Sequence, residues 1–209
     1  MEGSRWQLPR QHFQQNHKVR HEEYLNMGKV YGAIDEQIKE WIFAQKVFFV
    51  ATAPLSGEGH INCSPKDGDS IRVLDGKTLV YLDLIGSGVE TIAHVRENGR
   101  IIVMMCAFEG APKIMRFHGR GEVIEKDDSR FERFKALFVS EVGIRSFIVV
   151  DLDRISDSCG FGVPLLEFKQ HRKQLRACNE RNGEEKLADY KIKHNATSID
   201  GLPGVNTRR

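Results

Sequence analysis

The chain has 209 residues, of which 40% are hydrophobic and 29% charged, so it can bury a core and is not a disordered protein. Its 31 Lys and Arg residues nearly balance its 29 Asp and Glu residues, which argues against a dedicated nucleic-acid binder. The most apolar run, residues 47–53, has the length of a strand and not of a membrane span. We therefore expect a soluble protein that has neither nucleic acid nor a membrane as a partner.

Residues 1–27 are rich in Gln, His and Arg and contain no continuous apolar segment, which argues against a secretory signal. We expect an extended or disordered segment there, with a mitochondrial leader as the alternative. The four cysteines form no CxxC pair and have no histidine beside them at ligand spacing. We interpret them as small core residues of a cytoplasmic protein, and we expect no metal site.

From residue 34 onward, hydrophobic periodicity and turn residues define the predicted elements. Helices are predicted over residues 34–45, 87–98 and 128–139. Strands are predicted over residues 46–53, 59–63, 70–74, 78–84, 99–108, 113–125 and 146–155. Six or seven strands with turns between nearly all neighbours favour an antiparallel barrel with flanking helices, a mostly β fold of the α+β class.

The C-terminal region, residues 167–209, is predicted to be a helical extension packed on this barrel. Its segment 168–194 has a helical pattern and holds eight Lys and Arg residues against four Asp and Glu residues. We expect a helix lying across the barrel and not a second domain. Contact with nucleic acid is a weaker alternative, because aromatic residues that stack on bases are nearly absent there.

The first candidate for a binding site is the segment Asn62-Cys63-Ser64-Pro65-Lys66 at the exit of a predicted strand. Polar side chains together with one lysine can bind a phosphate, and a proline stiffens the turn that directs them. The alternative is that Ser-Pro-Lys, residues 64–66, lies in a turn that is only a solvated loop.

The second candidate is the segment 85–91, Ile-Gly-Ser-Gly-Val-Glu-Thr, between a strand and a helix. Glycines let the backbone approach an anion, and the free N–H groups of a helix start point toward it. The segment is not a Walker loop, because no Gly-Lys-Ser/Thr follows. The alternative is a plain helix cap, with Ser87 as the N-cap residue and Glu90 completing a capping box.

The third candidate is a row of basic side chains, because Arg116, His118 and Arg120 alternate onto one face of a long strand. Such a row suits an anionic, planar ligand. The alternative is an exposed sheet face in which Gly119 and Gly121 form a bulge or a barrel corner.

The fourth candidate is the loop 157–164, which carries two glycines, a phenylalanine and a proline beside Cys159. A tight loop of this kind could lie over an aromatic ring. Cys159 has no basic partner in the sequence that would mark it as a nucleophile, so we assign it no catalytic role.

These motifs follow one another in a distinctive order. A strand, Asn-x-Ser-Pro-Lys, a hairpin, Tyr-Leu-Asp-Leu, Gly-Ser-Gly, a helix and a strand precede Arg-x-His-Gly-x-Gly-Glu-Val. In this order the chain resembles, over residues 28–166, the pyridoxamine 5'-phosphate oxidase-like family of FMN-binding split barrels. It is most similar to an uncharacterised subgroup marked by the segments 158–164 and 195–203. The resemblance implies a homodimer with two FMN sites at the subunit interface, each lined by both chains.

The resemblance also implies which residues bind the cofactor. They are Asn62, Cys63, Ser64, Lys66, Arg72, Ser87, Thr91 and Arg116. Lys66 and Ser87 are similar to the residues that bind the FMN phosphate in the family. The usual Ser-Arg-Lys of the phosphate loop is Ser87-Gly88-Val89 here, so two cationic contacts are missing. Thr91 and Arg72 are the candidates to replace them.

The function implied is that of an FMN-dependent oxidoreductase acting on an unidentified small molecule, which serves as substrate or electron donor. The Arg-Leu-x-Pro ending by which genuine pyridoxamine phosphate oxidases hold their substrate has no match, which argues against that substrate. No catalytic residue is assigned, because a flavin carries the electron chemistry itself. The alternative is a non-catalytic protein that binds or carries FMN, haem or the deazaflavin F420 on the same fold.

Overall fold

The computed structural model describes residues 28–139 and 142–206, so the predicted N-terminal segment 1–27 lies outside the described residues. The strands are β1 (Val30–Tyr31), β2 (Val47–Thr52), β3 (Asn62–Asp67), β4 (Ile71–Asp75), β5 (Thr78–Leu84), β6 (Arg100–Cys106), β7 (Ile114–Ile124) and β8 (Ile144–Ser158). The helices are α2 (Glu36–Ala44), the short 3-10 helix η1 (Gly68–Ser70), α3 (Glu90–Asn98), α4 (Phe131–Lys135) and α5 (Gln174–Asn195).

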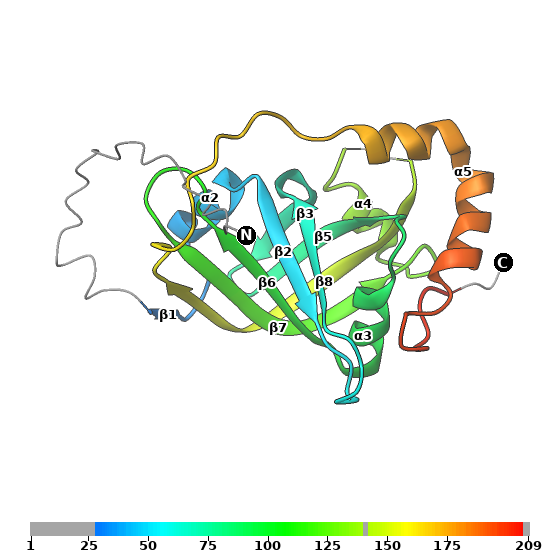
Figure 1. The fold of residues 1–209 in the computed structure, drawn as a ribbon, viewed down its shortest axis with the longest axis horizontal. Coiled ribbons are helices and arrows are strands. Elements are labelled where there is room, and N and C mark those ends of the chain that lie inside the picture. The colour runs from blue at the N-terminus through cyan, green and yellow to red at the C-terminus, as the bar shows by residue number, and fades with distance from the viewer. Residues whose placement is uncertain (1–27, 140–141, 207–209) are drawn as a thin grey trace, which may run out of the picture.

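The strands form one antiparallel sheet that curls into a split barrel, which confirms the predicted fold class (Figure 1). Their order across the sheet is β3-β2-β6-β7-β8-β5-β4, and β1 pairs with the end of β8. Four pairs of sequence neighbours are hydrogen-bonded, β2 with β3, β4 with β5, β6 with β7 and β7 with β8, as expected for strands joined by short connections. β8 also pairs with β5 and so ties the two halves of the sheet together.

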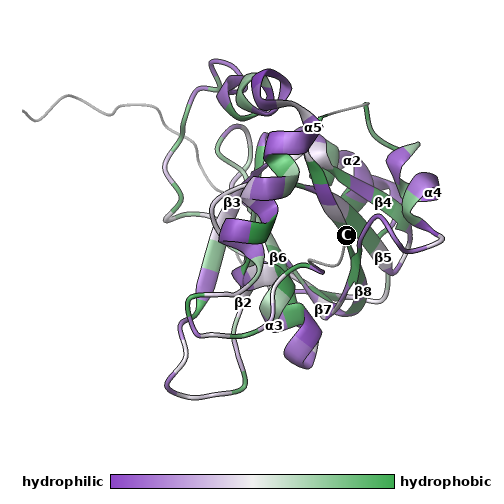
Figure 2. Cartoon of the chain, turned by 90° about the vertical axis from the view of Figure 1, so that its right-hand side faces the viewer, coloured by the Kyte–Doolittle hydropathy of each residue, from purple (hydrophilic) through white to green (hydrophobic). Residues whose placement is uncertain are grey.

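Alternating burial along the strands builds the core inside the barrel. In β2, Phe48 and Val50 are fully buried, and Met115 and Phe117 of β7 point the same way. A second cluster forms where α4 covers the outer face of the sheet. There the Phe131 ring centroid lies 5.1 Å from that of Phe147. In Figure 2 the barrel strands are largely hydrophobic, whereas α5 is mostly hydrophilic.

The register between β7 and β8 shifts at His118 and Gly119, which pair with Arg154 and Leu152, so that β8 carries one extra residue there. A Cβ atom on Gly119 would collide with the carbonyl oxygen of Asp151, so this close approach of the two strands requires glycine. Gly119 thus lies in β7 opposite an irregularity of β8.

The C-terminal region differs from the predicted single helix. Residues 160–173, which we call the strap, run extended across the top of the barrel, and α5 begins only at Gln174 (Figure 1). The strap backbone bonds to the β6–β7 loop, since the Leu166 N–H donates to the Phe108 carbonyl at 2.9 Å. Within the predicted helical segment 168–194, residues 168–173 are not helical, and the Phe168 N–H donates to Glu109 Oε1 of that loop at 3.3 Å. Within α5 the helix breaks at Gly183, whose φ is 70°.

The interpretation of the cysteines as core residues is correct for one of them only. Cys106 is buried, whereas Cys63, Cys159 and Cys178 are exposed, and all are free thiols. Alternation along a strand exposes Cys63. Cys159 lies directly before the strap and Cys178 lies in α5, and little core is available at either place. Across the described ranges, no helix combines the length and apolar character needed to cross a membrane.

Candidate functional site

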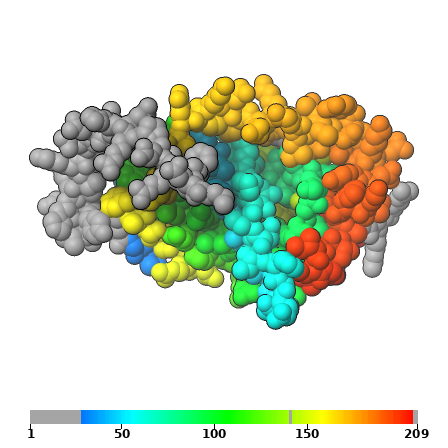
Figure 3. All heavy atoms as spheres, viewed as in Figure 1, coloured from blue at the N-terminus to red at the C-terminus, as the bar shows by residue number. Residues whose placement is uncertain are grey.

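A cavity of about 1100 Å³ lies between the curled sheet and the strap. It is lined by the end of α2, the inner face of β3, the loop before α3, the β6–β7 loop and the strap. The site residues that the sequence predicted and that the structure brings together here are Asn62, Ser64, Lys66, Ser87 and Thr91. Figure 3 shows the strap as a ridge along the top of the molecule, above this cavity.

Strand β3 places three polar side chains on one wall of the cavity. The sequence predicted a strand over 59–63 followed by a turn, but residues 62–67 pair with β2 from Asn62↔Thr52 to Asp67↔Val47. Side chains two residues apart on a strand share a face, so Asn62, Ser64 and Lys66 point inward together.

At one end of the cavity, a buried carboxylate holds two cations. Asp83 accepts hydrogen bonds from Lys66 Nζ at 3.2 Å, from Arg145 Nε at 2.7 Å and from Ser146 Oγ at 3.2 Å. Arg145 also donates to the Gly88 carbonyl at 2.6 Å, which ties it to the loop before α3. Asp83 is 2% exposed and Arg145 is 5% exposed. Lys66 and Arg145 thus share this buried carboxylate, and Glu90, which also lines the cavity, places a second negative charge near Arg145.

The charge state of this cluster is set by its own members. Burial raises the pKa of Asp83, but the positive charges of Arg145 and Lys66 outweigh burial and lower it to about 2. Burial opposes the charged form of Arg145, and the carboxylate of Asp83 nevertheless raises the pKa of that guanidinium. Asp83 and Arg145 are therefore both ionised at neutral pH.

The loop before α3 presents backbone donors to the same end of the cavity. Val89 is the N-cap residue of α3 and no side chain caps the helix, so the predicted capping box of Ser87 and Glu90 is wrong. The first N–H groups of an α-helix have no carbonyl partner within the helix. Because Ser87, Gly88, Glu90 and Thr91 line the cavity, these donors and the helix dipole lie at its edge.

The segment 195–204, which contains the second subgroup motif, packs against this loop. Asn195 is fully buried and donates from Nδ2 to the Gly86 carbonyl at 3.0 Å. Gly204 packs so closely that a Cβ atom there would collide with the Asn195 carbonyl oxygen and meet Val89. The motif therefore fixes the position of the loop without lining the cavity itself.

A chain of hydrogen bonds leads from the cavity wall into the core. Ser64 Oγ donates to Asn62 Oδ1 at 3.1 Å, and Asn62 Nδ2 donates to Thr91 Oγ1 at 2.9 Å and to Thr52 Oγ1 at 3.3 Å. Thr52 Oγ1 and His94 Nδ1 are 3.0 Å apart. The chain ends there, because His94 Nε2 is buried with no hydrogen-bond partner in the described part of the molecule. It orients the Asn62 amide at the cavity wall.

Three of the predicted site residues do not line the cavity. Cys63 lies on the opposite face of β3, where it is exposed. The Arg72 guanidinium donates to the carbonyls of Asp69 and Leu137, among others, at 2.7 and 3.1 Å. Arg116 donates to Ser158 Oγ at 2.7 Å. Within one chain, therefore, Arg72 does not stand in for the missing phosphate-loop cations.

Sequence reasoning missed Arg145 and the basic residues of the strap. Arg145 precedes the predicted strand 146–155, whereas β8 begins at Ile144. An arginine next to an apolar strand could have indicated a buried ion pair, because a buried charge needs a partner. The strap and the start of α5 add Lys169, His171, Arg172 and Arg176 to the cavity lining.

The donors of this cavity fit the phosphate and ring of a flavin nucleotide. Lys66 uses one of its N–H groups on Asp83, and Arg145 uses three of its five on Asp83 and Gly88. Both retain N–H groups that can donate to an anion, beside Ser87 and the start of α3. The volume of the cavity, about 1100 Å³, is at the upper end of pockets that take organic ligands.

The chain is similar to one curated protein and to solved structures of other proteins. The curated pyridoxamine 5'-phosphate oxidase family protein ustO of Aspergillus flavus is 39% identical over 196 residues, which cover 85% of this chain and 78% of that protein. Among solved structures, HupZ of Group A Streptococcus has 22% identity and a TM-score of 0.48, covering 61% of this chain and 98% of that one. The heme storage protein HutZ of Vibrio cholerae has 17% identity and a TM-score of 0.41, covering 62% and 98%.

The family model described as Pyridoxamine 5'-phosphate oxidase matches residues 34–159. That range runs from α2 to the end of β8, so it includes β3, the loop before α3 and Arg145, the elements that build the charged end of the cavity. Sequence, fold and the extent of both matches agree that this chain belongs to the pyridoxamine 5'-phosphate oxidase family.

Proposed function

We propose that the cavity binds FMN and that the protein is an FMN-dependent oxidoreductase acting on a small molecule other than pyridoxamine phosphate. The observation that carries this proposal is the pair of cations, Lys66 and Arg145, held by buried Asp83 beside the uncapped start of α3. Charge-assisted hydrogen bonds from such groups are the strong contacts that a phosphate monoester needs.

When bound, the flavin supplies the chemistry, since its ring can accept a hydride from a donor and pass electrons to an acceptor. The residues of the chain bind and orient it. Lys66 and Arg145 hold the phosphate. The amide oxygen of Asn62, whose Nδ2 donates to Thr52 and Thr91, can accept a hydrogen bond from the ring edge. The sheet and the strap form two walls of the cavity.

We further propose that the protein is a cytoplasmic homodimer in which the partner chain completes each site. Arg116 and Cys63 lie outside the cavity of their own chain, so a role for them in binding requires the second copy. Light scattering combined with size-exclusion chromatography measures this directly. A monomer at micromolar concentration that still binds FMN would contradict it.

The first experiment is an absorption spectrum of the purified protein, followed by mass spectrometry of the ligand released by heat. We expect a yellow protein that releases FMN. Lys66→Met should raise the dissociation constant for FMN about 10- to 100-fold, since hydrogen bonds to charged groups contribute about 1.5–3 kcal/mol. The control is Lys77→Met, which removes an exposed lysine outside the cavity lining. A colourless protein that does not bind added FMN would contradict the proposal.

Catalysis is tested separately from binding. Reduction of the bound flavin by NADH, NADPH or another small donor, with turnover in the presence of an artificial acceptor, is expected for the enzyme. Tight binding of FMN without reduction by any donor would instead identify a carrier protein. Release of haem or F420 in place of FMN would replace the assigned cofactor.

A further inference from the structure

The cationic side chains that line the cavity fall into two groups. The cations paired with a carboxylate are Lys66, Arg145 and Arg176. The cations with no carboxylate within ion-pair distance, among residues 28–139 and 142–206, are Lys46, Lys169 and Arg172. The paired group includes the two cations assigned to the flavin phosphate. The unpaired group belongs to the strap and to the chain segment beneath it.

One of the unpaired cations lies against an aromatic side chain of the strap. Lys46 Nζ lies 5.8 Å from the ring centroid of Phe168, which precedes Lys169 in the strap. The Phe168 ring in turn packs against His171, with centroids 4.7 Å apart. Phe168 and the three unpaired cations all line the same cavity, and this combination is suited to a molecule that has a planar ring and a negative charge.

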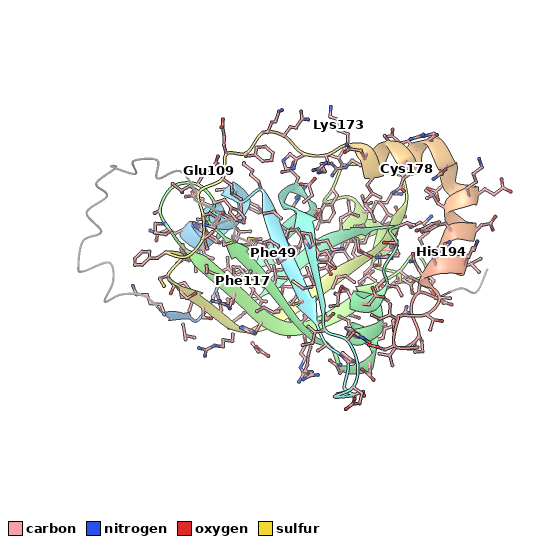
Figure 4. All side chains as sticks on the ribbon, in the orientation of Figure 1. Phe49, Glu109, Phe117, Lys173, Cys178 and His194 are labelled. Atoms are coloured by element: carbon pink, nitrogen blue, oxygen red, sulfur yellow. The ribbon has the colours of Figure 1, made fainter. Side chains whose placement is uncertain are left out.

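The strap is held over the cavity at several points, so these side chains extend from a fixed backbone. Near its start, Leu166 bonds to the β6–β7 loop, and the Phe168 N–H donates to Glu109 Oε1 at 3.3 Å. Figure 4 shows Glu109 on that loop, close to the strap. Near its end, His171 Nδ1 lies 3.0 Å from Asp67 Oδ1 and its Nε2 lies 3.5 Å from Asp69 Oδ2.

The cavity extends beyond the end at which Asp83 holds Lys66 and Arg145. Its volume of about 1100 Å³ is at the upper end of pockets that take organic ligands, which span roughly 300–1,000 Å³. A flavin anchored at Lys66 and Arg145 would occupy the end near the loop before α3. The end between Lys46 and the strap then stays available, and it opens at the molecular surface where Lys169 and Arg172 are exposed.

We propose that Lys46, Phe168, Lys169 and Arg172 form a second subsite, which binds a small anionic molecule with a planar ring as the co-substrate of the flavin. This inference rests on the proposed function for the role of the ligand, but the subsite itself is built from groups that do not hold the flavin phosphate. The anionic group is a phosphate or a carboxylate.

The test is a calorimetric titration of the FMN-loaded protein with two probes, NADP⁺ for phosphate and benzoate for carboxylate. We expect saturable binding of at least one probe. The double variant Lys169→Gln, Arg172→Gln should weaken it about 5- to 10-fold, since exposed charge pairs contribute about 0.2–1 kcal/mol each. The affinity for FMN should stay within about twofold.

The matched control removes two other exposed cations, with Lys173→Gln and Arg181→Gln. Lys173 lies at the junction of the strap and α5 (Figure 4), and neither residue lines the cavity. This variant should bind both probes and FMN like the parent protein. If both double variants weaken the probes equally, the effect comes from overall charge and the subsite is refuted.

Two further outcomes would overturn the inference. If neither probe saturates at millimolar concentration, there is no such subsite. If the Lys169, Arg172 variant loses FMN as strongly as the probe, the strap cations hold the flavin phosphate instead. If the protein does not bind FMN at all, the proposed function fails, and titration of the flavin-free protein with the same probes still decides on the subsite.

Discussion

The two walls of the cavity are built in different ways. The wall made by the sheet and the loop before α3 consists of buried groups that bond to one another, such as Asp83 with Arg145 and Asn195 with Gly86. The strap consists of mostly exposed residues held by a few backbone bonds and ion pairs. The first wall is inseparable from the stability of the barrel, whereas the second can vary without affecting the core. A shared cofactor is therefore suited to the first wall and a variable co-substrate to the second.

Replacing one arginine by methionine in each wall should give the largest difference in unfolding free energy between the two walls. Arg145→Met leaves the buried Asp83 carboxylate with Lys66 as its one cationic partner, and breaking a buried ion pair costs about 3–5 kcal/mol. Arg172→Met, in the exposed strap, should change the free energy of unfolding by less than about 0.5 kcal/mol. Urea unfolding of both variants measures the difference. Equal effects would show that the two walls do not differ in this way.

Glycine substitutions give the next largest contrast. Gly204→Ala places a methyl group against the Asn195 carbonyl oxygen and Val89, and overpacking of this kind costs about 1–3 kcal/mol. Because Asn195 supports the loop before α3, this variant should also bind FMN more weakly. Gly162→Ala in the strap meets no atom within 4 Å and should be close to neutral. Thermal unfolding and FMN titration check both; a neutral Gly204→Ala would mean that the supporting segment adapts freely.

Lowering the pH should have a smaller effect on the free energy of unfolding. The effect acts through His94, at the end of the hydrogen-bond chain behind Asn62. Burial lowers the pKa of His94 below its usual value of 6.5, although the charges of Asp200, Glu90 and Glu97 oppose this. The unfolded chain therefore binds a proton more readily than the folded one. The stability that neutral His94 contributes to the fold is therefore fully present above about pH 6.5. It is lost as the pH falls through the lowered pKa of His94.

Unfolding free energy measured between pH 7.5 and 5 should thus fall less for His94→Gln than for the parent protein. His118→Gln, outside this chain of hydrogen bonds, serves as the control and should keep the parent's pH dependence. If His94→Gln retains that dependence too, another group carries it.

The smallest effect on stability is expected at the end of the strap. Asp67→Asn weakens the ion pairs to His171 and Arg176, which should cost less than about 1 kcal/mol because these groups are partly exposed. The change should instead appear in hydrogen exchange, as faster exchange of residues 166–173 with little change in the barrel strands. Asp69→Asn, which removes the longer 3.5 Å contact, should have a weaker effect. Unchanged exchange in both variants would show that the backbone bonds alone hold the strap.

The sequence was sufficient to predict the barrel, because alternating apolar residues and turn signals are local features. It was misleading at β3, where Ser-Pro-Lys-Asp resembles a turn but pairs with β2 through contacts distant in sequence. Arg145 could not be assigned, because its burial depends on Asp83, 62 residues away. The predicted helical segment likewise included residues 168–173 of the strap, which are not helical and where the Phe168 N–H bonds to Glu109 of the β6–β7 loop. Local pattern thus predicted the scaffold, and the parts of the site that depend on long-range pairs required the structure.

Pro65 has a consequence for how copies of this chain can associate. β3 is an edge strand, since it pairs with β2 on one side and with no other strand in the described residues. Proline has no N–H to offer a neighbouring strand, and the adjacent charged residues Lys66 and Asp67 further disfavour strand addition. The open edge of the barrel is thereby protected against growth into an intermolecular sheet and the aggregation that would follow. Assembly of two copies must then proceed through side-chain faces and not through a shared backbone ladder at this edge.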